Sequence, residues 1–189
     1  MSRHRLRRAI NERDTATAER ILCEAAPHSD DVINDFAGDD CLLDVLFCNT
    51  SKESPIFDAI RSGSVAMVTL LITHGCDLTC RGKSRGQTVV HACVAERNAH
   101  MLRVVLKHMP PEGARKVDAH GRTALHYLAM QTPSQHDNTE QSELQEIAQT
   151  LLQSMDSETL SRADDKQKSC SDYASQNCNN WLLNVIENK

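Results

Sequence analysis

The pattern Gly-x-Thr-x-x-His occurs twice in this chain, in GQTVVHACVA at residues 86–95 and in GRTALHYLA at residues 121–129. Alignment of the chain against itself on the threonine of this pattern gives four equivalent positions, Ser54, Thr88, Thr123 and Ser169. The intervals between them are 34, 35 and 46 residues. A repeat unit of this size cannot bury its apolar face alone, so the sequence predicts an array of stacked units.

The stretch SPIFDAIRSGSVAMVTLLITHGCDL, residues 54–78, shows what one unit contains. Ser54 as an N-cap and Pro55 in the first helical position predict the start of one helix. Gly63 is expected to end that helix in a left-handed turn. A second helix is predicted by an apolar stripe and a closing glycine, at Val68, Leu71, Ile72 and Gly75.

A period near 33 residues with a Thr-Pro-Leu-His start is typical of ankyrin repeats, and the chain resembles that family over almost its whole length, in four to five units. The resemblance implies an all-α solenoid of stacked helix pairs with β-hairpin fingers along one edge. Two positions depart from the family pattern. Val89 stands where the family has proline, and Arg97 stands where it has the turn glycine.

The repeat pattern divides the chain into a capping repeat at 1–26, repeats at 54–82, 83–117 and 118–160, and a degenerate C-terminal capping repeat at 161–189. A polar surface loop at about 131–142 accounts for the 46-residue interval. The acidic stretch 27–53 fits no unit. It is either an insertion whose apolar segment CLLDVLFC packs back on the first helix pair, or a worn-down half-repeat.

Composition excludes several classes of protein. The net charge of −5 argues against a general nucleic-acid binder. No run of about 18 apolar residues occurs, so no membrane span is expected, and the basic N-terminus lacks the apolar region of a secretory signal. The eight cysteines show no zinc-ligand spacing, so we expect no metal or cofactor and an intracellular location, cytoplasmic or nuclear.

The repeated histidines are interpreted as structural. His91 and His126 occupy equivalent slots of adjacent units, so stacking places them roughly 10 Å apart, too far to share one metal ion. The resemblance implies that threonine and histidine bond each other and nearby backbone, which ties adjacent repeats together. The structural motif residues are Ser54, Thr88, His91, Thr123 and His126, and no catalytic residue is assigned.

Basic residues recur at the expected fingers, above all in RGKSRG at residues 81–86. This stretch is either a solvated turn or part of a basic ridge for an acidic partner. The family's usual contact slots, together with these residues, give Arg61, Ser62, Arg81, Lys83, Arg85, Gln87, Ala95, Glu96, His120, Arg122, Met130, Gln131, Lys166 and Lys168 as candidate partner-binding residues.

The expected function is therefore non-catalytic binding of another protein with an acidic segment, as an adaptor, scaffold or inhibitor. No small-molecule substrate, membrane or nucleic acid is expected. One alternative is an inhibitor resembling the ankyrin inhibitors of Rel-type transcription factors, a class found in hosts and viruses. Others are a regulatory fragment of a longer enzyme, and nucleic-acid binding through the N-terminal arginines Arg3, Arg5, Arg7 and Arg8, which no aromatic stacking platform accompanies.

Overall fold

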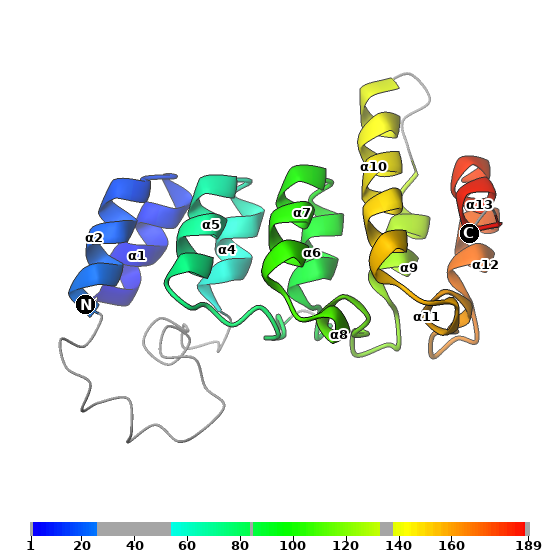
Figure 1. The fold of residues 1–189 in the computed structure, drawn as a ribbon, viewed down its shortest axis with the longest axis horizontal. Helices are drawn as coiled ribbons and strands as arrows, with labels where there is room; N and C mark the ends of the chain where they lie inside the picture. The colour runs from blue at the N-terminus through cyan, green and yellow to red at the C-terminus, as the bar shows by residue number, and fades with distance from the viewer. Residues whose placement is uncertain (1, 26–53, 84, 133–137, 188–189) are drawn as a thin grey trace.

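The computed structural model describes residues 2–25, 54–83, 85–132 and 138–187 (Figure 1). The acidic stretch 27–53 lies outside the described residues, as do residues 133–137 of the expected loop. In the described ranges the chain forms helix pairs that stand side by side in a single row, as the repeat pattern predicts.

The pairs are α1 (Ser2–Asn11) with α2 (Thr15–Ala25), α4 (Pro55–Arg61) with α5 (Val65–Thr73), α6 (Val89–Ala95) with α7 (Ala99–His108), α9 (Ala124–Met130) with α10 (Asn138–Ser154), and α12 (Cys170–Gln176) with α13 (Asn180–Glu187). The short helices α8 (Pro111–Ala114) and α11 (Ser157–Ser161), which the sequence pattern did not predict, follow α7 and α10. First helices pack on first helices, and second helices on second helices, from each pair to the next.

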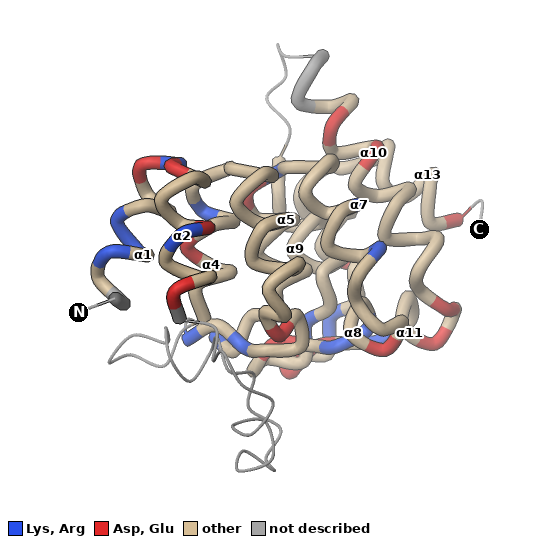
Figure 2. The backbone as a smooth tube through the Cα atoms, turned by 60° about the vertical axis from the view of Figure 1, so that its left-hand side comes forward, with Lys and Arg blue, Asp and Glu red and all other residues tan. Residues whose placement is uncertain are grey.

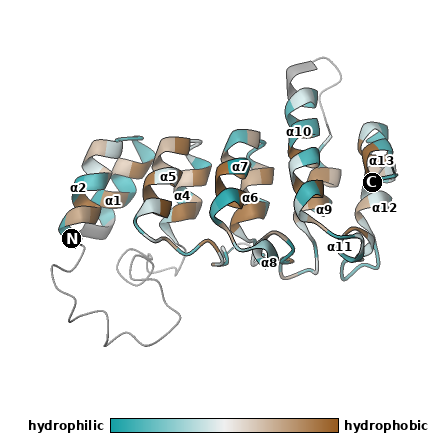
Figure 3. Cartoon of the chain, in the orientation of Figure 1, coloured by the Kyte–Doolittle hydropathy of each residue, from teal (hydrophilic) through white to brown (hydrophobic). Residues whose placement is uncertain are grey.

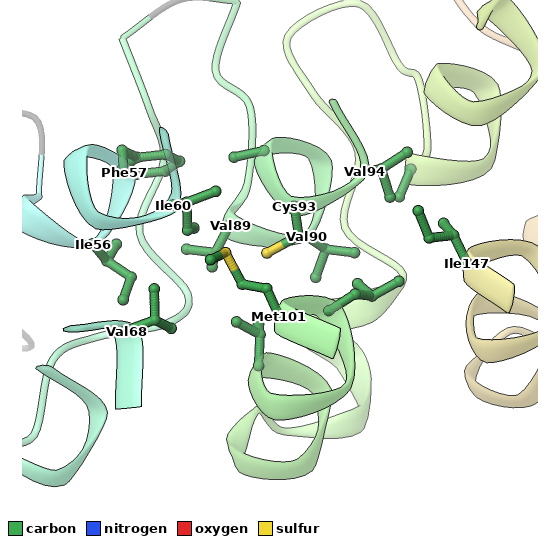
Figure 4. Packing of buried hydrophobic residues seen from close by; sticks show 14 of the residues in the cluster. Ile56, Phe57, Ile60, Val68, Val89, Val90, Cys93, Val94, Met101 and Ile147 are labelled. Carbon is green, nitrogen blue, oxygen red and sulfur yellow. The ribbon is translucent and has the colours of Figure 1, made fainter. Parts of the chain in front are cut away.

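One continuous apolar core runs along the row between the helices (Figure 3). Figure 4 shows side chains of neighbouring pairs meeting there, among them Val68, Val89 and Met101. Leucine, isoleucine, valine, alanine and methionine supply most of this core, as the low aromatic content requires. Cys93 is fully buried, and burial raises the pKa of its thiol to about 12, so it packs as a small apolar residue.

Residues with a left-handed backbone conformation follow the ends of helices at the glycine positions of the repeat pattern. Gly63 has a φ of +70° and Gly75 a φ of +79°. Arg97 adopts the same conformation, with a φ of +53°, in the place of the turn glycine. A residue with a side chain is disfavoured there by about 1 kcal/mol, so packing of the flanking helices must impose the turn.

The fingers are a minor addition to the helices, and the antiparallel bridge between Arg81 and Thr88 is the only strand-like pairing within the described residues. One expectation about the loops needs correction. The expected loop at 131–142 is too long, since α10 already begins at Asn138. The residues 138–141, NTEQ, contain neither proline nor glycine, and they extend α10 above the neighbouring helices (Figure 1).

The position two residues before the motif threonine or serine offers a test of the finger turns. Gly121 has a φ of +73°, and a Cβ there would lie 3.3 Å from the Asp165 carboxylate, whereas Gln167 occupies the equivalent slot with a φ of +58°. We expect Gly121→Ala to lower the free energy of unfolding by about 1–2 kcal/mol, and Gln167→Gly to raise it by roughly 0.5 kcal/mol. Urea unfolding followed by circular dichroism measures both changes. Gln167→Ala keeps the Cβ and should change little, and a loss of stability in Gln167→Gly would contradict the argument.

Candidate protein-interaction surface

Each Gly-x-Thr-x-x-His motif joins one repeat to the next. The Thr88 hydroxyl lies 2.7 Å from Nδ1 of His91, and the Thr88 backbone N–H donates to the same nitrogen at 3.3 Å. Nδ1 therefore carries no proton, and Nε2 donates to the Arg122 carbonyl of the following finger at 2.9 Å. Thr123 and His126 repeat this arrangement, with Nε2 of His126 donating to the Lys168 carbonyl at 3.2 Å.

Burial sets the charge of both imidazoles. It lowers the pKa of His91 to about 4 and also lowers the pKa of His126. Both rings are therefore neutral at neutral pH, with each nitrogen engaged in a hydrogen bond inside the fold. In the first full unit Ser54 lacks such a partner, because Phe57 occupies the histidine slot and the Ser54 hydroxyl lies 3.5 Å from the Cys76 sulfur.

A buried aspartate braces the second finger, which comprises residues 115–123. Oδ1 of Asp118 accepts the backbone N–H groups of His120 and Arg122, at 2.8 and 2.9 Å. Its Oδ2 accepts the Tyr127 hydroxyl at 2.9 Å, and that hydroxyl in turn accepts from the Gln87 amide. Burial alone would raise the pKa of Asp118, but these hydrogen bonds outweigh it and lower the pKa.

The third finger, residues 162–169, has the same brace. Asp164 accepts the backbone N–H groups of Lys166 and Lys168 and the Tyr173 hydroxyl, the last at 2.7 Å. Burial opposes ionisation of Asp164, but the hydrogen bonds again prevail and lower its pKa. Neither brace was predicted from the sequence, although each aspartate lies five residues before the motif position and each tyrosine four residues after it.

The first finger, residues 79–83 and 85–88, is built differently. The hydrogen bond that closes this finger runs from the Gly82 N–H to the Gln87 carbonyl. It encloses one residue more than the equivalent bond from the Asp118 N–H to the Arg122 carbonyl. Gly82 thus takes the place of the bracing aspartate, and Ala92 takes the place of its tyrosine. The Arg81 guanidinium substitutes for the brace, donating to the carbonyls of Gly86 and Val117 at 3.0 and 2.7 Å.

The structure divides the candidate basic residues of the fingers into two groups. Arg81, Arg122 and Lys168 make internal contacts. Arg122 pairs with the buried Asp164 at 3.3 Å and is 12% exposed, and Lys168 donates to Gln176 and lies over the Tyr173 ring. The second group, Lys83, Arg85 and Lys166, together with His120, is exposed at the finger tips.

The candidate residues near the ends of the first helices also differ in exposure. Arg61 is exposed and pairs with Asp58 at 2.7 Å, while the Ser62 hydroxyl donates to the Ala59 carbonyl. The Gln131 amide donates to the Val94 carbonyl at 2.8 Å. The three remaining candidates are Ala95 and Glu96, which are exposed, and Met130, which is half-buried.

The first helices and the fingers together line one face of the row, here called the concave face. Residues four and seven positions after each motif threonine or serine form two rows across it. The first row is Asp58, Ala92, Tyr127 and Tyr173, and the second row is Arg61, Ala95, Met130 and Gln176. Figure 2 shows lysine and arginine along α1 and in the loops at the feet of the helices, where aspartate and glutamate are interspersed.

Two other kinds of site are absent from the described part of the chain. None of its groups of histidine, cysteine, aspartate and glutamate could hold a metal ion. Among the helices that the structure describes, none has the length and apolarity needed to cross a membrane.

Comparison with known proteins agrees with the repeat geometry. A family model of ankyrin repeats matches residues 56–162 in three copies. This range covers more than half of the chain and runs from α4 to the end of α11. No curated protein matches the sequence.

The aspartate–tyrosine brace predicts the effect of removing one hydroxyl. Tyr127→Phe leaves a buried oxygen of Asp118 without its donor, so we expect the free energy of unfolding to fall by about 1–3 kcal/mol. A double-mutant cycle with Asp118→Ala, measured by urea unfolding, isolates the interaction. If the two changes are additive, the brace does not contribute as described.

The buried His91 predicts a loss of stability in acid. Its folded pKa of about 4 lies below the unfolded value near 6.5, so the unfolded chain binds more protons between these values. The contribution is complete above pH ~6.5 and falls by roughly 3 kcal/mol as the pH approaches 4. Urea unfolding across this range measures the loss. His91→Phe, which copies the slot of Phe57, should show a flatter pH dependence, and an unchanged slope would contradict this assignment.

Proposed function

The chain belongs to the ankyrin-repeat family, and on that premise we propose that it is a non-catalytic module that binds an acidic segment of a partner protein. Ankyrin repeats are generally protein–protein interaction modules. The proposed contact surface is the concave face, with the exposed cations of the finger tips at one edge. An adaptor, a scaffold and an inhibitor would all use this surface in the same way.

One observation carries the proposal. Lys83 and Arg85 are exposed on the first finger, whose described residues include no acidic side chain. In the other two fingers an aspartate is buried at the same place, and the arginine or lysine before the motif makes internal contacts. The first finger therefore presents positive charges, on Lys83 and Arg85, that are not engaged as the equivalent cations of the other two fingers are.

The state of the nucleophilic and basic side chains supports a binding role over a catalytic one. His91 and His126 are neutral, buried and engaged at both nitrogens. Cys93 is buried with a raised pKa. General-base or nucleophilic catalysis requires an accessible group with a suitable pKa, and these three side chains lack both properties. The six free cysteines of the described residues also support a reducing location inside the cell, in the cytoplasm or nucleus.

The cations at the finger tips would act mainly on the first encounter with the partner protein. Exposed ion pairs contribute up to about 1 kcal/mol each, so the charges of Lys83, Arg85 and Lys166 would set orientation and association rate. Apolar contacts on the first helices would then set most of the affinity.

Charge reversal on the first finger tests this proposal. We expect Lys83→Glu with Arg85→Glu to reduce the capture of a partner that the unmodified chain retains from a cell lysate, because the reversed charges repel an acidic segment. Arg81 is left in place because its guanidinium holds the finger together. The matched control is Arg20→Glu with Lys107→Glu, two exposed cations on the second helices α2 and α7. Circular dichroism must show equal helicity in all three proteins. Partners retained equally by both variants would contradict the proposal.

A further inference from the structure

We infer that a cleft between α7 and α10 binds a lysine or arginine side chain of a partner protein. The cleft includes the turn between α6 and α7, at the end of the helices opposite to the fingers (Figure 1). It is therefore separate from the finger cations, and it can bind a partner whether or not the proposed function is correct.

The cleft exists because α10 is longer than the helices beside it. α10 has 17 residues, whereas α7 has 10, and α10 rises above its neighbours (Figure 1). The space between them has a volume of about 370 Å³. Residues 96–103, in the α6–α7 turn and the start of α7, line one side of it, and residues 143 and 146 of α10 line the other.

An ion pair closes the cleft on the side toward the fingers. Arg103 of α7 pairs with Glu146 of α10, so this contact bridges the two helices. Arg103 lies about one helical turn after Ala99, and Glu146 about one turn after Glu143. The pair therefore forms the floor of the cleft, and Ala99 and Glu143 lie nearer to its open end.

Two carboxylates of the cleft have no ion-pair partner among the described residues. Glu96 lies on the wall made by the α6–α7 turn and Glu143 on the wall made by α10, and both are exposed. The two arginines of the cleft are already engaged, Arg103 with Glu146 and Arg97 in another contact within the chain. The charge left to a partner is therefore negative, and a cation between the two walls would relieve the repulsion of the carboxylates.

The start of α7 does not turn the cleft into an anion site. A helix start attracts anions through its free N–H groups. Here the Asn98 side chain already accepts the Met101 N–H at 2.9 Å. An anion would also have to approach Glu96 and Glu143, which lie on both walls.

A long cationic side chain fits the cleft better than a metal ion does. None of the described groups of histidine, cysteine, aspartate and glutamate, including those of the cleft, could hold a metal ion. A lysine or arginine needs only one or two carboxylates at its charged end, and its apolar stem can lie along Ala99. A protein would supply this side chain and could contact the projecting part of α10, where Figure 2 shows acidic positions.

Neutralising the two carboxylates tests the site. The probe is a displayed library of random short peptides, selected on the unmodified chain and depleted on the Glu96→Gln, Glu143→Gln variant. We expect the remaining peptides to carry lysine or arginine and to bind that variant at least about tenfold more weakly. The matched control is Glu19→Gln with Glu158→Gln, two exposed glutamates outside the cleft, which should bind the peptides as the unmodified chain does.

A substitution that leaves the glutamates in place separates the cleft from a general attraction to an acidic protein. His100 lines the cleft and is exposed, so the fold should tolerate His100→Trp, whose indole would occupy the cleft. We expect this variant to bind the selected peptides at least about tenfold more weakly. His108→Trp, at an exposed position near the other end of α7, should bind them unchanged. Circular dichroism must show equal helicity in all variants.

The inference is overturned if no cationic peptide is recovered, if the Glu19→Gln, Glu158→Gln control loses binding equally, or if His100→Trp binds as the unmodified chain does. The Lys83→Glu, Arg85→Glu variant should bind the selected peptides at least as well as the unmodified chain, because its changes lie on the first finger. Failure of the proposed function is thus distinguishable from failure of this site.

Discussion

The hydrogen bond from an imidazole to the carbonyl of the next finger is the interaction on which the array depends. Nδ1 of His91 accepts from the start of its own helix, while Nε2 donates to Arg122, 31 residues further along the chain. One side chain thus fixes both the entry of α6 and the position of the following finger. The finger in turn carries Asp118, which holds the Tyr127 hydroxyl of α9 in place, so the arrangement of the concave face depends on this hydrogen bond.

The contact between one repeat and the next differs where the residue at the histidine position differs. Phe57 cannot donate a hydrogen bond, and the Gln87 carbonyl, which precedes the motif Thr88, accepts the Gly82 N–H of its own finger. Apolar packing then connects this pair to the next, and Phe57 is almost fully buried. At the C-terminal end Asp172 occupies the histidine slot, and its carboxylate accepts from the Ser169 backbone and hydroxyl, capping its own helix.

Sequence alignment predicted the repeats because stacking requires apolar residues and turn glycines at fixed offsets. It located the first helices, the left-handed Gly63 and the glycine slot held by Arg97. The alignment could not predict which finger cations are exposed. Whether the Arg122 guanidinium is exposed depends on its ion pair with Asp164, 42 residues away, and on the burial of that carboxylate. The start of α10 and the short helices α8 and α11 were missed because they lie in segments outside the repeat pattern.

Phe57, which stands at the histidine position of the motif, also determines which boundary between repeats opens first. The boundary after α5 is held by apolar contacts with no imidazole bridge, whereas those after α7 and α10 each contain a buried imidazole. In a row of units that interact only with their neighbours, opening begins at the weakest boundary. Acid weakens the two histidine boundaries and spares the phenylalanine boundary, because only the former take up a proton. Acidification therefore shifts the first opening toward the C-terminal repeats, and the half of the molecule that frays first depends on pH.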